Sequence, residues 1–395
     1  MNPVIVIPTF VSARRRKDGG SILTTYDHMT PISQPGELGR CLNSLQKVRG
    51  IGQIVVLVAS EPTIENQAAE KVQATVSQFP GLNVVVVGAP ELALIQQRME
   101  QLGLGKLAKE VGLSGYGAIR NLGLLVADTL GFDAVVFLDD DEVVLAPDFL
   151  EKALYGLGHE TRQRLPILAK SGYFYNEAGS PLADTTKKNG LTNRWWTKRI
   201  EFNRWMERAL SGTRISRSNY VCGGCFAVHA RAFRRVSFDP FITRGEDLDF
   251  LFNMRLAGMD VWFDNAWVVK HLPPHQAEYA PRFMQNVYRW YYERAKLASA
   301  ARRPDITSVT AASLMPYPGP WISDGLDDRV RKTALVRALF TREHRGYWRV
   351  YRHGIDEARE HAREHQDDYL RFVSFWPSIV AGLAGDEGLR ALLER

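Results

Sequence analysis

The sequence predicts a layered α/β protein with a mostly parallel sheet, followed by a helical C-terminal region. Short apolar runs alternate with helical patterns through the first half of the chain, which is typical of βαβ units. After Pro273-Pro274 the chain contains almost no strand-like run. This change of pattern predicts an α/β domain over residues 1–275 and a helical region over residues 276–395.

The predicted strands are short apolar runs rich in β-branched residues, as expected for buried strands of a parallel sheet. In the first half of the chain they are Val4–Ile7, Ile54–Val58, Val84–Val87 and Val135–Leu138. Helical patterns lie between them, near residues 37–48, 63–78 and 117–130. Farther along, the sequence predicts a strand-like run over Val221–Val228, a helix near 246–257, and strands over Val261–Phe263 and Trp267–Val269.

The composition is that of an ordinary soluble globular protein, with 45% hydrophobic and 24% charged residues among 395. A net charge of +6 is too small to favour nucleic-acid binding, but it suits an anionic substrate. Three cysteines argue against a disulfide framework and for a reducing compartment. The chain begins with a strand rather than a secretory signal, and no apolar run approaches the roughly 20 residues of a membrane span. We therefore expect a cytoplasmic protein without a transmembrane segment, and the oligomeric state stays open.

Four consecutive acids, Asp139, Asp140, Asp141 and Glu142, come directly behind the predicted strand that ends at Leu138. Strands of open α/β folds end at the sheet edge where ligands bind. Four carboxylates at one place repel one another unless a cation lies among them, and oxygen ligands favour a hard divalent ion. The acids therefore predict a metal site that is able to hold a diphosphate.

Further motifs surround this acidic motif in a definite order along the chain. They are Pro8 and Thr9 at the end of the first strand, Gly117–Gly123 with Arg120 at the opening of a helix, Cys222-Gly223-Gly224-Cys225-Phe226, Glu246-Asp247 at the start of another helix, and His271 at the end of the last strand. Over about residues 1–275 this order resembles the GT-A glycosyltransferases, most closely those of family 2. The resemblance implies a Rossmann-like mixed sheet flanked by helices, and the transfer of a sugar from a UDP- or GDP-sugar to an acceptor hydroxyl.

On the donor side, the resemblance implies that Asp141 binds Mg²⁺ or Mn²⁺ and that Asp139 contacts the metal or the nucleotide ribose. His271 falls where several GT-A enzymes place a further metal ligand, and His275 is the fallback. The other two acids of the motif, Asp140 and Glu142, take these places if the opposite side of the strand faces the donor, because consecutive strand residues face opposite sides.

Three more positions are expected to contact the donor. Pro8 and Thr9 end the first strand, at the same sheet edge as the acids. Arg120 lies near a helix N-terminus, which favours anions, so it is expected to contact a donor phosphate or the ribose. The alternative for Arg120 is an ordinary surface arginine.

The resemblance also assigns the acceptor side. Asp247 is the expected base that removes the acceptor proton in an inverting transfer, and Glu246 binds the acceptor or shares this role. Acids in a first helical turn also act as simple caps. Two alternatives stay open: a retaining GT-A enzyme of the mannosylglycerate-synthase kind, and a non-catalytic module that binds sugar or nucleic acid.

The donor base is not determined by the motifs. Family members usually have an acid after the second strand that reads the base, often uracil. Here the strand ends Val58-Ala59-Ser60-Glu61, so Glu61 is the nearby candidate and the choice between UDP and GDP is open.

Residues 194–217 combine seven basic with two acidic residues and three tryptophans. Together with Gly223 and Gly224, Trp196 of this segment is expected on the acceptor side, where aromatic faces stack on sugars. The segment suits an anionic acceptor, or a lipid-linked one with docking at the membrane surface. Packing of the tryptophans into the domain explains it equally well.

Four other segments receive weaker interpretations. The long loops over residues 11–36, which contain a basic run at 14–17, and 176–197 suit either lids or solvated loops. The Cys222–Cys225 pair precedes a strand and lacks further zinc ligands, so we expect plain thiols. The run from Glu357 to His365 carries charge on every side, which predicts a solvated helix.

Overall fold

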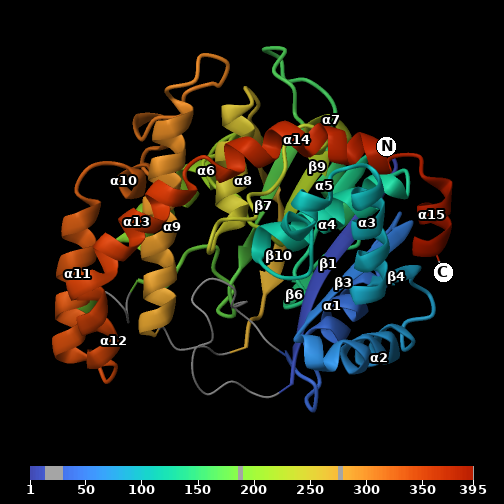
Figure 1. Cartoon of the computed structure of the whole chain (residues 1–395), viewed down its shortest axis with the longest axis horizontal. Helices are drawn as coiled ribbons and strands as arrows, with labels where there is room; N and C mark the ends of the chain where they lie inside the picture. The colour runs from blue at the N-terminus through green and yellow to red at the C-terminus, as the bar shows by residue number, and fades with distance from the viewer. Residues whose placement is uncertain (14–29, 186–189, 275–278, 395) are drawn as a thin grey trace.

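The computed structural model describes residues 1–13, 30–185, 190–274 and 279–394. The basic run at 14–17 and His275, the fallback metal ligand, lie outside the described residues. Figure 1 shows a twisted sheet with helices on both of its faces and a group of C-terminal helices, α9 to α13, beside it. The predicted fold class, a mixed sheet flanked by helices with a helical C-terminal region, is confirmed.

Within the described residues, ten strands form one sheet in the order β4-β3-β1-β5-β9-β7-β10-β6, with β2 beside β1 and β8 beside β10. Their bounds are β1 Pro3–Ser12, β2 Thr30–Pro31, β3 Gln53–Ser60, β4 Val84–Val87, β5 Ala134–Phe137, β6 Glu142–Val144, β7 Ala169–Tyr175, β8 Ile215–Arg217, β9 Phe226–His229 and β10 Val261–His271.

The sheet is less parallel than the sequence indicates. Neighbours among β4, β3, β1 and β5 are parallel, as predicted. In the other half, β9 runs antiparallel between β5 and β7, and β6 runs antiparallel to β10. This antiparallel half brings segments that are far apart in the sequence against the acidic motif.

The helices of the first 275 residues are α1 Leu38–Leu45, α2 Glu65–Val76, α3 Ala89–Gln101, α4 Tyr116–Thr129, α5 Phe149–Leu154, α6 Lys198–Ser211, α7 Ala230–Phe233 and α8 Glu246–Leu256. The later helices are α9 Ala280–Ala300, α10 Gly319–Ile322, α11 Leu326–Phe340, α12 His344–Arg349, α13 Ile355–His365, α14 Asp368–Leu383 and α15 Glu387–Leu393.

Alternating side chains of β1 divide the core into two layers. Val4 and Val6 join the apolar cluster that contains α3, α4, α8 and the C-terminal helices. Ile5 and Ile7 join the opposite cluster, which contains α1, α2 and α5. This period of two is what a strand buried on both faces requires.

The helices beyond β10 do not stand apart from the sheet. In Figure 1, α14 (red) runs along the top of the view, and both α14 and α15 contact α3 and α4. One apolar cluster runs from β1 into these last helices. The division into domains at residue 275 stays a prediction.

Two strands differ from their predictions for a physical reason. Strand β7 was not predicted, because its sequence contains Lys170, Ser171 and Gly172. The ammonium of Lys170 is buried and pairs with Asp264 at 2.9 Å, so a buried ion pair replaces the expected apolar residue. The two predicted strands within 261–269 form one strand, β10, with an irregularity in its pairing between Phe263 and Val268.

Candidate active site

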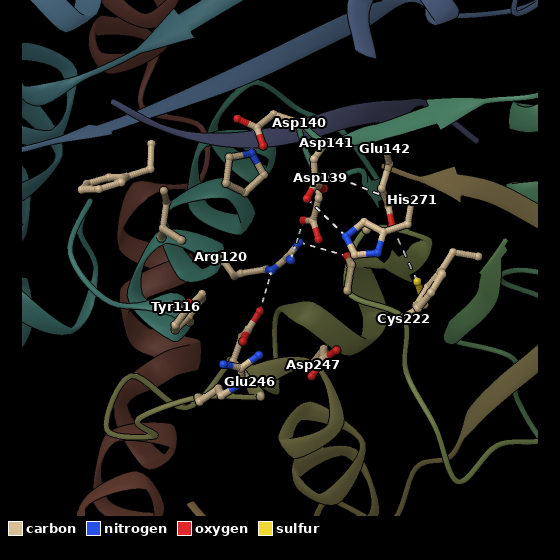
Figure 2. A pocket seen from close by; sticks show the side chains of 18 of the residues that line it. Tyr116, Arg120, Asp139, Asp140, Asp141, Glu142, Cys222, Glu246, Asp247 and His271 are labelled. Carbon is tan, nitrogen blue, oxygen red and sulfur yellow. Dashed lines mark hydrogen bonds and ion pairs between the residues drawn. The ribbon is translucent and has the colours of Figure 1, made fainter. Parts of the chain in front are cut away.

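The acidic motif lies in the turn between β5 and β6, just beyond the pairing of β5 with β1 (Figure 2). A cavity of about 430 Å³ opens there. Its lining includes Pro8 and Thr9 together with all four acids of the motif. The predicted meeting of the first strand and the acids is therefore present in the structure.

Within the motif, the carboxylates point in different directions. Asp140 turns toward β1, where its Oδ2 accepts a hydrogen bond from the hydroxyl of Thr9 at 2.5 Å. Figure 2 shows Asp139 and Asp141 turned instead toward Arg120 and His271. The outer two aspartates thus share one side of the chain, as the alternation of the motif predicts.

His271 lies at the end of β10, directly against the acidic motif. Its Nε2 is 3.2 Å from Oδ2 of Asp141, and its ring packs edge-on against Phe174. The antiparallel pairing of β10 with β6 places His271 opposite Glu142, and the amide of Leu272 donates to the carbonyl of Asp141. Backbone pairing therefore fixes the position of this imidazole.

Arg120 is buried rather than exposed, and it joins two parts of the site. Its Nη2 donates to Asp139 at 2.8 Å, while its Nε donates to Glu246 at 3.3 Å. Its Nη1 donates to the carbonyl of Gly223 at 3.0 Å. Burial works to lower the pKa of Arg120, but the charges of Asp139 and Glu246 outweigh it and raise that pKa. The guanidinium therefore stays charged and holds the donor-side and acceptor-side acids together.

Two acids of the motif, Asp140 and Glu142, are unfavourable in their charged form. Burial, followed by the charges of the neighbouring aspartates, raises the pKa of Asp140 and that of Glu142 well above their usual values. Desolvation and like charges both favour the neutral carboxyl. A cation bound among these acids would remove part of this cost.

Glycines 223 and 224 allow the chain to approach this cluster closely. A Cβ on Gly224 would lie 2.1 Å from Oε2 of Glu142, and a Cβ on Gly223 would lie 2.8 Å from Nη2 of Arg120. A side chain in either place would force Arg120 or Glu142 to move. The glycine pair, predicted on the acceptor side, thus lines the same cavity as the acids.

Helix α8 presents Glu246 and Asp247 in its first turn. The helix begins after Gly245, whose φ of +75° is a left-handed conformation that glycine adopts without strain. Burial, followed by the charge of Asp247, raises the pKa of Glu246 to about 7. Asp247 accepts only a local hydrogen bond from Leu248 among those assigned, and it lines the cavity.

Lys296 of helix α9 holds helix α8 in place. The ammonium of Lys296 is fully buried and contacts Asp249 at 2.5 Å, Asp239 at 2.8 Å and Asn253 at 3.0 Å. Breaking such a buried pair by removal of one partner typically costs about 3–5 kcal/mol. The orientation of Glu246 and Asp247 therefore depends on a residue beyond position 275.

Two predicted site residues lie away from the acidic motif. Glu61 follows the end of β3 and is absent from the residues that line either cavity at this edge, although its neighbour Ala59 lines the first. Trp196 lines a second, adjoining cavity, and its ring packs against Phe283 and Trp321. The three cysteines are free and buried, as expected for plain thiols.

The structure adds residues that the motifs did not indicate. Lys198, Arg244, Arg282 and Arg289 line the cavity beside Asp247. Lys198 belongs to the basic segment 194–217, and Arg244 precedes the Glu-Asp motif, so a sequence signal existed for both. Arg282 and Arg289 lie on α9, where no pattern distinguishes them from ordinary helix residues.

Two negative findings apply to the described part of the chain. No group of three or more His, Cys, Asp or Glu side chains there is already arranged as a metal cluster. No helix in the described ranges combines the length and the apolar character that crossing a membrane requires.

Several solved structures are similar to the chain at low identity. Mannosyltransferase PcManGT from Pyrobaculum calidifontis, in complex with GDP-Man and Mn²⁺, is 12% identical with a TM-score of 0.48, covering 97% of this chain and 86% of that one. GalNAc-T7 with UDP, GalNAc and Mn²⁺ is 15% identical with a TM-score of 0.40, covering 87% and 58%. Glucosyl-3-phosphoglycerate synthase from Mycobacterium tuberculosis, with Mn²⁺ and UDP-glucose, is 14% identical with a TM-score of 0.36, covering 77% and 80%.

The family comparison covers the central part of the chain. None of the curated proteins matches the sequence significantly. Residues 134–316, slightly under half of the chain, match the Glycosyl transferase family group 2. This range begins with β5, contains the acidic motif, the glycine pair, α8 and His271, and extends past Arg289. The resemblance to family 2 glycosyltransferases is thus confirmed for residues 134–316, the part of the chain that matches the model of this family.

Proposed function

We propose that this enzyme transfers a sugar from a nucleoside-diphosphate sugar to an acceptor hydroxyl with inversion, assisted by Mg²⁺ or Mn²⁺. Asp139, Asp141 and His271 are the proposed metal ligands, and Asp247 is the proposed base. The observation that carries the proposal is the position of Asp247, which lines both the cavity of the acidic motif and the adjoining second cavity.

The donor set suits a divalent cation. Carboxylate oxygens with one imidazole nitrogen are acceptable to both Mg²⁺ and Mn²⁺, and the nitrogen is more favourable for Mn²⁺. Burial, and after it the charges of the neighbouring aspartates, raises the pKa values of Asp140 and Glu142 at this place. A divalent ion here would neutralise the diphosphate leaving group.

The protein side chains then have distinct tasks. The acceptor oxygen forms a bond to the anomeric carbon while the bond from that carbon to the diphosphate oxygen breaks, and the diphosphate leaves with the electron pair. Asp247 takes the hydroxyl proton. Arg120 holds Asp139 and Glu246 in fixed positions. Pro8 and Thr9 form the floor on the β1 side.

A nucleotide panel tests the donor half of the proposal. Thermal shifts with UDP, GDP, TDP and CDP are measured with Mn²⁺, followed by hydrolysis of the matching sugar nucleotides. We expect one nucleotide to stabilise the protein in a metal-dependent manner. Asp141→Ala should lose this stabilisation, while Asp305→Ala, which changes an exposed acid, should retain it. Stabilisation that survives excess chelator or Asp141→Ala would remove the metal assignment.

The anomeric configuration of the product tests the stereochemical half. Proton NMR of the first product should show inversion relative to the donor. Retention of configuration would assign the retaining mechanism instead and would release Asp247 from its proposed role.

A further inference from the structure

A second cavity of about 400 Å³ adjoins the first and shares Asp247 with it. Its volume is within the usual range for small-molecule sites. Six basic residues line it, and Asp247 is the one acid among its lining residues in the described chain. The basic residues are Lys198, Arg199, Arg244, Arg282, Arg289 and Arg337.

The positive charges lie close enough to affect one another. Burial, followed by the charges of Arg289 and Arg244, lowers the pKa of Lys198 to about 7. Asp247 and Glu293 act in the opposite direction but do not compensate. Burial is the largest cause of this lowered pKa, and the neighbouring cations Arg289 and Arg244 add to it.

Arg289 carries an unsatisfied donor at the junction of the two cavities. Its side chain is buried, with 4% exposed, and its Nε donates to Glu293 at 3.0 Å. Its Nη2 is buried and has no hydrogen-bond partner among the described residues. Buried guanidinium donors are normally paired, so this is an unusual feature.

Lys198 also lacks an anionic partner. Its Nζ lies 5.6 Å from the centroid of the Trp290 ring. Within the described residues, no hydrogen bond or ion pair is assigned to this ammonium. Lys198 and Arg289 thus line both cavities, and each has less than its full set of partners among the described residues.

We propose, on the basis of the glycosyltransferase function above, that the acceptor carries an anionic group, a phosphate or a carboxylate, which binds in this second cavity between Lys198 and Arg289. The acceptor hydroxyl then lies toward Asp247, at the junction with the donor cavity. Trp196, Phe202 and Tyr317 line the same cavity and supply apolar walls for the rest of the molecule.

The donor diphosphate is a less suitable occupant of this cavity. Neither the four acids of the motif nor His271 lines it. Arg199, Trp196 and Arg337 line the second cavity and not the first.

An acceptor series tests this assignment. With a fixed donor, transfer is compared between glycerol and glycerol 3-phosphate, which differ in one phosphate, and between glycerol and glycerate. Phosphatidylinositol vesicles supply a lipid headgroup whose phosphate is a singly charged diester. We expect the charged acceptors to have a KM lower by at least about tenfold, as for one charge-assisted hydrogen bond of 1.5–3 kcal/mol. Preference for the soluble compounds or for the vesicles identifies the source of the anion.

Variants of Lys198 connect the effect to this cavity. Lys198→Ala should raise the KM for glycerol 3-phosphate at least about tenfold and leave the Kd of the donor nucleotide within about twofold. Lys198→Arg should restore most of the affinity. Lys47→Ala, which changes an exposed lysine just after α1, is the matched control.

Two results would overturn the proposal. One is equal use of glycerol and its charged analogues. The other is a loss in Lys198→Ala that falls on the nucleotide Kd rather than on the acceptor KM. If no acceptor in the series reacts, calorimetric binding of inorganic phosphate decides: we expect binding to the wild type and a loss in Lys198→Ala, and absence of binding rejects the cavity. The glycosyltransferase proposal itself fails separately, by absence of nucleotide binding and donor hydrolysis.

Discussion

His271 and Asp141 are 130 positions apart in the chain, yet Nε2 of the histidine lies 3.2 Å from Oδ2 of the aspartate. The pairing of β10 with β6 brings them together, so the contact follows from the sheet rather than from flexible side chains. Two potential ligands held by backbone pairing lose little entropy when they bind an ion.

For this reason His271→Ala should weaken the binding of the metal ion. We expect the Mn²⁺ concentration for half-maximal donor hydrolysis to rise by at least about tenfold, as for damage to a metal's ligand sphere. A Mn²⁺ titration of hydrolysis measures it, with Asp305→Ala as the surface control. An unchanged titration curve would show that His271 is structural.

Asp247→Asn should separate catalysis from binding. The amide has the shape of the acid but cannot take a proton, so kcat for transfer should fall by about 10²–10⁴-fold. The nucleotide Kd, measured by thermal shift, should stay near the wild-type value. Normal turnover in this variant would move the base to another residue, and Glu246 is the first to examine.

Glu246 makes the stability of the protein depend on pH. Its pKa is raised from 4.5 to about 7 in the folded state, so between these values the folded protein holds a proton that the unfolded chain has released. The free energy of unfolding therefore falls as pH rises through this window, by up to about 3 kcal/mol.

Glu246→Gln removes this contribution. The Tm of the variant, relative to the Tm of the wild type, should be higher at pH 8 than at pH 5. Differential scanning calorimetry at the two pH values gives the comparison, and other titrating groups cancel because both proteins carry them. An identical Tm difference at both pH values would contradict the raised pKa.

The lowered pKa of Lys198 predicts that acceptor binding depends on pH. Arg289 and Arg244 face it as cations, and Asp247 and Glu293 as anions. Because its pKa is about 7, its charge is lost as pH rises from 7 to 9, and the KM for glycerol 3-phosphate should increase. The phosphate is already dianionic in that range, since its second pKa is about 6. Lys198→Arg should flatten the profile, whereas an unchanged slope in that variant would assign the effect to another group.

Gly224→Ala tests the close approach of the chain to the acids. The new methyl group would collide with the carboxylate of Glu142, so we expect a loss of about 1–3 kcal/mol in the free energy of unfolding. Gly52→Ala is the control, because nothing lies within 4 Å of the Cβ position there. Urea denaturation of both variants measures the difference, and equal losses would argue that Gly224 has room.

The sequence predicted the parts of the site that are local in the chain. The acids behind β5 and the Glu-Asp pair of α8 each follow a recognisable element boundary, and Thr9 follows the predicted strand Val4–Ile7, which the structure extends to Ser12. Their mutual contacts could not be predicted, because they depend on how β9, β7 and β10 cross the sheet. The bridge from Asp139 through Arg120 to Glu246 is such a contact.

The sequence prediction was wrong where small residues form the buried face of a helix. The run from Glu357 to His365 was expected to be a solvated helix, but this is wrong for one face of α13. Ile355, Ala358 and Ala362 are buried there, and α13 packs against α9. Alanine in a charged segment gives no apolar stripe, so only the partner helix reveals the buried face.

The last helices, α14 and α15, pack against α3 and α4 near the start of the chain, and this packing has a practical consequence. Trp376 of α14 donates its indole N–H to the carbonyl of Phe233, and Asp386 pairs with Arg98 of α3. A truncated protein that stopped after α13 would leave the outer surface of α3 and α4 bare. Proteolysis or a bulky fusion at the extreme end should therefore weaken nucleotide binding, which thermal shifts of a clipped sample would reveal.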